Sequence, residues 1–186
     1  MPYSFIYDHV PIAVYVKFVI LKVGGKERYT VLINSIYEKY NLSRVYPVPL
    51  LDIVKALGYE ARYFIVKPDN INLAGATYYK EKKIFISPIE FGGRYNFMLA
   101  HELGHIILGH DKDNDREYDT RAEIIAPERK TKEYDANEFA AELLMPATKL
   151  KEIYDRNGSI PKLAIFFNVS LAAVQVRMKK LGINYE

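Results

Sequence analysis

The order of apolar and polar positions predicts strands in the first half of the chain and helices in the second half. Short runs rich in β-branched and aromatic residues, bounded by Gly, Pro or charged turn residues, are typical of strands. Such runs lie at Val10–Val23, Ala61–Val66, Ala76–Tyr79 and Lys83–Ser87. The charged stretch Asp111–Lys132 predicts a loop with one further short strand at Ala122–Ile125.

Apolar residues that recur every three to four positions predict the helices. The predicted helices lie at Leu50–Leu57, from Arg94 to about His110, at Glu133–Met145, and in three short segments from Thr148 onward. The segment Tyr29–Tyr40 is ambiguous, because TVLI suits a strand while the spacing of the later apolar residues suits a helix, which we favour. Strands followed by helices indicate an α+β chain.

Composition limits the chemistry that this chain can carry. A length of 186 residues fits one domain, or one domain with a small appendage. Because there is no cysteine, disulfides, thiolate nucleophiles and Cys-based zinc fingers are excluded. A metal site would have to use His, Asp and Glu, and three of the four histidines (His101, His105 and His110) lie within ten residues.

Charge and hydropathy point to no special surface. The formal net charge of the chain is +3. Residues 149–186 hold seven basic and three acidic side chains, and such a modest excess of positive charge is typical of a solvated face. The longest apolar stretch, Val10–Val23, is interrupted by Lys17 and Lys22 and is shorter than the roughly 20 residues of a membrane span. No signal-peptide pattern accompanies it. We therefore expect a cytoplasmic protein without a membrane span.

The sequence HELGH at residues 101–105 has the pattern H-E-x-x-H. In a helix, positions i and i+4 share a face, so the imidazoles of His101 and His105 can converge on one ion. Glu102 points from the neighbouring side and can act as general base toward a water that the metal activates. The flanking apolar residues indicate a buried helix, where unpaired histidines would be costly.

A zinc site of this kind needs a third protein ligand. His110 follows His105 by five residues, whereas the metzincin pattern requires six, so we expect His110 to interact with the helix end instead. The helix that begins near Glu133 offers a carboxylate, and Asn137 shares its face and could orient a histidine. From composition alone, three other carboxylates compete with Glu133: Asp135, Glu138 and Glu142.

These residues resemble a known family. FMLAHELGH (97–105) followed by EYDANEFAAELLMP (133–146) is similar to the ImmA/IrrE zinc metallopeptidases, and the similarity covers roughly residues 46–183. The resemblance implies a gluzincin-like core, made of a small sheet, the HExxH helix and a glutamate helix, with Glu133 as the third ligand. It also implies zinc, with manganese as an alternative, and a protein substrate that is a helix-turn-helix transcriptional repressor, so that the enzyme acts as an anti-repressor.

The resemblance suggests three parts of the chain. Residues 1–45 form an extension of unknown role, residues 46–148 the metallopeptidase core, and residues 149–186 a helical, helix-turn-helix-like end. In the last part, SLAAVQVRMKK offers only Gln175 and Arg177 for reading base edges, so specific DNA binding is not expected. The alternatives to a peptidase are a binding module that sequesters a repressor, and a DNA-binding regulator with a structural metal.

Peptide substrates of such enzymes commonly add to the edge of a sheet. The strand directly before the HELGH helix, with Ile84, Phe85 and Ile86, is our candidate edge for this role. An internal strand is the alternative. The residue that stabilises the oxyanion is left unassigned, because 16 tyrosines compete for it.

Overall fold

The structure of the protein is a computed structural model that describes residues 23, 25, 27–65, 73–110, 117–120, 127–156 and 158–184. Its elements, in chain order, are α2 (Glu27–Lys39), α3 (Leu50–Ala56), β1 (Glu60–Tyr63), β2 (Leu73–Tyr78), β3 (Lys83–Ile86), α4 (Gly93–Leu108), β4 (Glu117–Thr120), α5 (Pro127–Leu144), α6 (Ala147–Asp155), α7 (Ile160–Phe167) and α8 (Leu171–Lys180). Both the α+β class and the helical carboxyl end are confirmed.

The four strands form one mixed sheet in the order β1-β3-β2-β4. Strand β3 pairs with β1 in parallel and with β2 in antiparallel orientation, with Phe85 opposite both Arg62 and Ala76. The prediction that Ile84, Phe85 and Ile86 form a substrate-binding edge is therefore wrong, because both sides of their backbone are already paired. Among the described strands, the edges of the sheet are β1 and β4.

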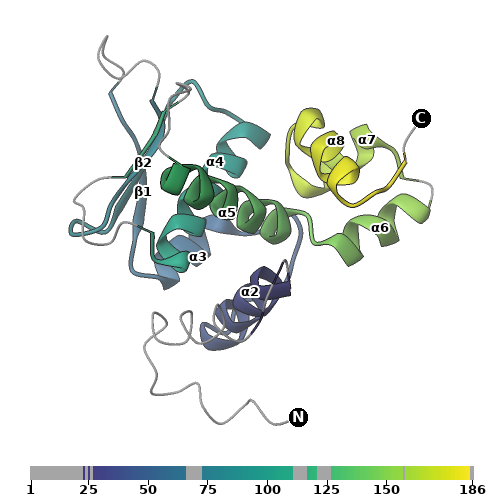
Figure 1. Cartoon of the computed structure of the whole chain (residues 1–186), viewed down its shortest axis with the longest axis horizontal. Coiled ribbons are helices and arrows are strands. Elements are labelled where there is room, and N and C mark those ends of the chain that lie inside the picture. Colours follow the sequence, from purple (N-terminus) through teal and green to yellow (C-terminus); the bar gives the residue numbers. More distant parts are fainter. Residues whose placement is uncertain are drawn as a thin grey trace.

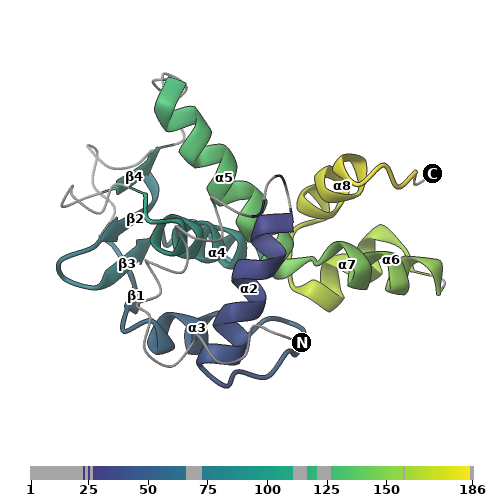
Figure 2. The same cartoon turned by 60° about the horizontal axis from the view of Figure 1, so that its bottom comes forward.

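Helices α4 and α5 lie between the sheet on one side and helices α6 to α8 on the other (Figure 1). Helix α2 crosses α5, and α3 packs against α4 (Figure 2). One hydrophobic cluster runs through the whole arrangement. It extends from Leu32 of α2 through Leu103 of α4 and Phe139 of α5 to Val174 of α8. The division of the chain at residues 45 and 148 stays a prediction.

Most predicted elements agree with the structure to within a few residues. Helix α5 starts at Pro127, six residues before the predicted start. The prediction missed these residues because the charged first turns of the helix carry no apolar periodicity. Residues 1–22, which hold most of the strand expected at Val10–Val23, and the strand expected at Ala122–Ile125 lie outside the described residues. The strand seen in the charged stretch is β4.

The carboxyl-terminal helices begin and end at well-formed caps. Ser159 and Ser170 accept backbone hydrogen bonds from Lys162 and Ala173, and so mark the starts of α7 and α8. Asn168 ends α7 in the left-handed conformation. The two helices meet at an angle of 107° across a break of three residues. In the part of the chain that the structure describes, no single helix is long and apolar enough to cross a membrane; only α7 and α8 together, bent at that break, pass on length and composition.

Candidate metal centre and active site

The two histidines of the HELGH motif lie side by side on the buried face of α4. His101 and His105 are 2% and 1% exposed, and their Nε2 atoms are 2.9 Å apart. Gly109 ends the helix four residues after His105 in a left-handed conformation, and its N–H binds the carbonyl of His105. The one-turn spacing of the motif therefore places both imidazoles at one point.

Helix α5 brings Glu133 to the same point because it packs very closely against α4. A Cβ at Gly104 would lie 3.1 Å from the backbone Cα and O of Ala136, so a larger residue at position 104 would require the two helices to shift by a few tenths of an ångström. Gly104, placed inside a helix in spite of its unfavourable propensity, has this close approach as its reason.

The three side chains form a compact donor group. Glu133 Oε2 lies 3.2 Å from His101 Nε2 and 3.7 Å from His105 Nε2, and the three potential ligand atoms all lie within 4.8 Å of one another. Burial by itself would raise the pKa of the Glu133 carboxyl, but hydrogen bonds from the two histidines outweigh it and hold this pKa well below its usual range. Glu133 is thus an anion facing two imidazoles.

This group fits a zinc-like ion on the chemistry and spacing of its donors. Bonds of about 2.0–2.1 Å in a tetrahedron give edges of roughly 3.3–3.4 Å between ligand atoms. The observed separations of 2.9, 3.2 and 3.7 Å lie around that value. Two imidazole nitrogens and one carboxylate oxygen are also the donors that catalytic zinc sites use with one position left open.

Each histidine has a polar partner on its other ring nitrogen. His101 Nδ1 lies 3.1 Å from Asn137 Oδ1, and His105 Nδ1 lies 3.0 Å from His110 Nδ1. With a metal bound, a proton on each Nδ1 donated to these partners would leave both Nε2 lone pairs free to bind the ion. The sequence predicts that Asn137 orients a histidine, and its side chain lies against His101; the contact of His110 with His105 was not predicted.

The carboxylates that competed with Glu133 on composition lie elsewhere. Asp135 binds Arg28 and the Tyr29 hydroxyl at 2.6 and 2.9 Å. Glu138 pairs with Lys180, and Glu142 pairs with Arg177. These three side chains fasten α5 to α2 and α8, whereas Glu133 belongs to the donor group.

Glu102 is buried beside the donor group and lies against strand β2. Its Oε2 accepts a hydrogen bond of 2.6 Å from the Thr77 hydroxyl, and both side chains are at most 1% exposed. Gly75 leaves room for the same carboxylate, because a Cβ there would lie 2.6 Å from Glu102 Oε1. Neither Gly75 nor Thr77 was singled out from the sequence, since nothing in a short strand signals contact with a helix 25 residues later.

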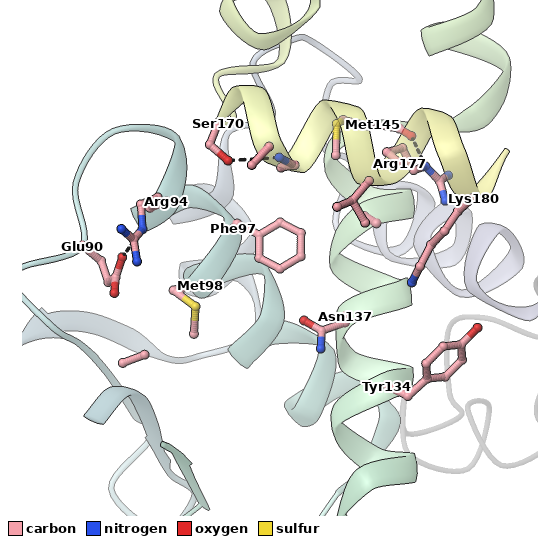
Figure 3. Close-up of a pocket in the computed structure, with 15 residues that line it drawn as sticks. Glu90, Arg94, Phe97, Met98, Tyr134, Asn137, Met145, Ser170, Arg177 and Lys180 are labelled. Carbon is pink, nitrogen blue, oxygen red and sulfur yellow. Dashed lines mark hydrogen bonds and ion pairs between the residues drawn. The ribbon is translucent and has the colours of Figure 1, made fainter. Parts of the chain in front are cut away.

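A cleft of about 540 Å³ opens next to the donor group, between α8 and the pair α4 and α5 (Figure 3). Asn137, which binds His101, is part of its lining, and so are Ala74 of β2 and Tyr134 of α5. Ala74 precedes Gly75 in the chain, Tyr134 follows Glu133, and Asn137 contacts His101. The donors themselves are not among the lining residues, and the cleft is separated from the ring of His101 by the side chain of Asn137.

Comparison with known proteins agrees with this geometry. Residues 55–179, more than half of the chain, match the family described as the IrrE N-terminal-like domain (Peptidase_M78). A search of curated proteins finds no match to this sequence. The matched segment contains HELGH, Glu133 and Asn137, as well as Gly75 and Thr77. The chain belongs to the IrrE N-terminal-like family of metallopeptidases.

Proposed function

We propose that the protein is a zinc-dependent endopeptidase in which His101, His105 and Glu133 hold the metal and Glu102 is the catalytic base. The observation that carries this proposal is the convergence of three ligand atoms within 4.8 Å, next to a buried carboxylate that is not one of them. A purely structural metal has no use for this additional carboxylate. A zinc ion supplies Lewis acidity, which makes water a stronger acid and a peptide carbonyl a better electrophile.

Glu102 moves the protons of the hydrolysis. It accepts a proton from the water that adds to the scissile carbonyl carbon, and it delivers that proton to the amine as the carbon–nitrogen bond breaks. The hydrogen bond from Thr77 and the space above Gly75 fix the direction of its carboxylate. Asn137 and His110 are positioning residues, because they hold the rings of His101 and His105.

The substrate that we propose is a specific protein, a helix-turn-helix transcriptional repressor, whose cleavage relieves repression. The similarity of FMLAHELGH and ANEFAAELLMP to the ImmA/IrrE enzymes supports this choice. A repressor acts where the genome is, so the same proposal places the enzyme in the cytoplasm.

Metal analysis of the purified protein tests the ligand set. We expect about one zinc ion per chain in the wild type and in Glu102→Gln, and a large loss of zinc in His105→Ala and Glu133→Ala. Supplying manganese in place of zinc, followed by measurement of hydrolysis, decides between the two metals. Full zinc retention by Glu133→Ala would contradict the ligand set.

Cleavage of a purified repressor tests the substrate. Glu102→Gln, which still binds metal, should retain a repressor that the wild type cuts at one bond, and should leave that bond intact. Cleavage by Glu102→Gln at the wild-type rate would contradict the assignment of the base.

A non-proteolytic module that binds a repressor or DNA is the second candidate. The angle of 107° between α7 and α8 supports it, because helix-turn-helix motifs join helices at about 90–120°. Arg177, however, is 3% exposed and paired with Glu142, so it does not face a DNA groove. A gel-shift assay with duplex DNA over a series of salt concentrations tests this candidate, which requires binding that is selective for sequence.

A further inference from the structure

The cleft beside the donor group has an apolar lining that comes from three helices. Its main apolar side chains are Phe97, Met98, Ala141, Met145, Ala173 and Val176. Phe97 and Met98 lie on α4, just before the HELGH motif, and the alanine and valine of α8 face them across the cleft. A volume of about 540 Å³ lies within the range of sites that bind small organic ligands, roughly 300–1,000 Å³.

Helix α8 forms one wall of this cleft, and contacts at both of its ends attach it to the rest of the protein. At its start, a Cβ at Gly93 would lie 2.5 Å from the backbone N of Ser170, and Asn96 donates to the carbonyl of Asn168 at 2.9 Å. At its other end, Arg177 donates to the carbonyl of Met145 at 3.1 Å, and Lys180 pairs with Glu138. The opening between these attachments is thus fixed by specific contacts.

The charged groups around the cleft are paired with one another. Glu90 and Arg94 form an ion pair of 2.9 Å at one side of the cleft. Arg177 and Lys180 pair with carboxylates of α5 at the other side. Figure 3 shows Lys180 on the same side of the cleft as Tyr134 and Asn137. The lining is therefore suited to an apolar group and offers little to a charged one.

One lining residue of the cleft also contacts the donor group. Asn137 contributes to the lining with the same side chain whose Oδ1 binds His101 Nδ1. Ala74 precedes Gly75, on which the Glu102 carboxylate lies. A group bound in the cleft against Asn137 would therefore lie one side chain away from the ring of His101.

We propose that this cleft is the specificity pocket of the enzyme, and that it accepts a large apolar side chain such as Phe, Leu or Met next to the scissile bond. The proposal rests on the proposed function and adds to it a substrate class and a role for α8. The carboxyl-terminal helices then select the substrate through the inner face of α8, which forms one wall of the pocket.

Two variants of α8 form a matched pair for the test. Val176 contributes to the lining of the cleft and is 56% exposed, so Val176→Trp would narrow its mouth without disturbing the core. Gln175, its neighbour, is exposed, is not among the lining residues, and points about 100° away around the helix. Gln175→Trp therefore controls for the added indole ring and for any change in stability, which thermal unfolding of both variants would measure.

The first measurement is the cleavage profile of the zinc-loaded protein on a mixture of synthetic decapeptides, with cut sites mapped by mass spectrometry. We expect Phe, Leu or Met next to the cut at least fivefold more often than in the mixture. Val176→Trp should lower kcat/KM for such a peptide at least tenfold, and Gln175→Trp less than twofold. Cleavage without apolar preference, or equal effects of the two substitutions, would overturn the pocket while leaving the peptidase in place.

The second measurement separates the pocket from the activity. Binding of N-acetyl-phenylalanine amide to the zinc-loaded Glu102→Gln variant is followed by NMR, with N-acetyl-aspartate amide as the charged control. We expect the phenylalanine compound to bind and to shift the Val176 methyl signals, and Val176→Trp to weaken its binding at least fivefold. If neither the peptides nor a purified repressor is cut but this binding is found, the proposed function fails and the apolar pocket stands. If the phenylalanine compound does not bind, the pocket is overturned.

Discussion

The carboxylate of Glu102 lies in the space that a side chain at position 75 would need. A Cβ built on Gly75 comes within 2.6 Å of Glu102 Oε1 and within 3.2 Å of its Cδ. A glycine in a strand thus sets the position of a buried acid on a helix, although the two residues are far apart in sequence.

Gly75→Ala should therefore damage catalysis and spare the metal. The clash meets the end of a flexible side chain, so we expect the carboxylate of Glu102 to move and the fold to persist, with little change in Tm. A displacement of about 1 Å can cost on the order of 100-fold in rate. The measurements are kcat/KM on a cleaved peptide and zinc content, which should stay near that of the wild type. Activity within twofold of wild type would contradict Glu102 as the base.

Thr77 should act on the same carboxylate through its hydroxyl. Thr77→Val removes the donor to Glu102 Oε2, and we expect kcat to fall roughly tenfold with KM little changed. Because a buried acceptor loses its donor, the free energy of unfolding should also fall by about 1–3 kcal/mol. Thr77→Ser keeps the hydroxyl and is the matched control. Equal loss of kcat in both variants would assign the effect to packing.

His110 should tune the metal affinity even though it is not one of the three ligands. Removing its contact with His105 in His110→Ala should weaken zinc binding 10- to 100-fold, the range typical of such outer partners, and Asn137→Ala should do the same through His101. Competition with a fluorescent zinc chelator measures the affinity. An unchanged zinc affinity in His110→Ala would show that the ring contact does not orient His105.

Metal removal should lower the stability of the fold. Zinc at 100 times its Kd stabilises a folded state by about 2.7 kcal/mol, and a chelator abolishes this contribution. We expect a clear drop of Tm on chelation in the wild type and none in Glu133→Ala, which lacks one ligand. An equal drop in both proteins would mean that the chelator acts somewhere else.

Alkaline unfolding should report on Tyr37. Burial raises the pKa of this phenol from 10 to about 12. Because the folded state resists ionisation, the stability it contributes is complete below pH 10 and is lost as the pH rises toward 12. Tyr37→Phe should therefore make the loss of stability between pH 10 and 12 less steep, as denaturant titrations at several pH values would measure. An identical slope in both proteins would contradict the shift.

The elements that could be predicted from the sequence are those with a strong local pattern. The periodicity of residues 94–110 and the HELGH spacing led directly to α4, and the pairing of HELGH with the Glu133 segment led to the family. The order of the strands could not be predicted, because pairing is non-local. For that reason β3 was taken for an edge although it lies between β1 and β2.

The residues that contact the side chains of the HELGH motif could not be predicted from the sequence either. Thr77 and Gly75 look like ordinary strand residues until the sheet is placed under α4. His110 was assigned to the helix end from its spacing, and its backbone N–H does bind the carbonyl of His105. The left-handed turn at Gly109 also brings the ring of His110 to His105. This contact depends on a backbone conformation that the spacing of the residues does not encode.

The attachments of α5 bear on where the working unit of this protein begins and ends. The family match covers residues 55–179, yet Asp135 and Glu138 are held by Arg28 and by Lys180, both outside that range. Excising the matched segment would keep every residue of the motif while uncovering the face of α5 on which α2 rests. The segment that matches the family therefore leaves out one partner of α5 on α2 and another at the end of α8.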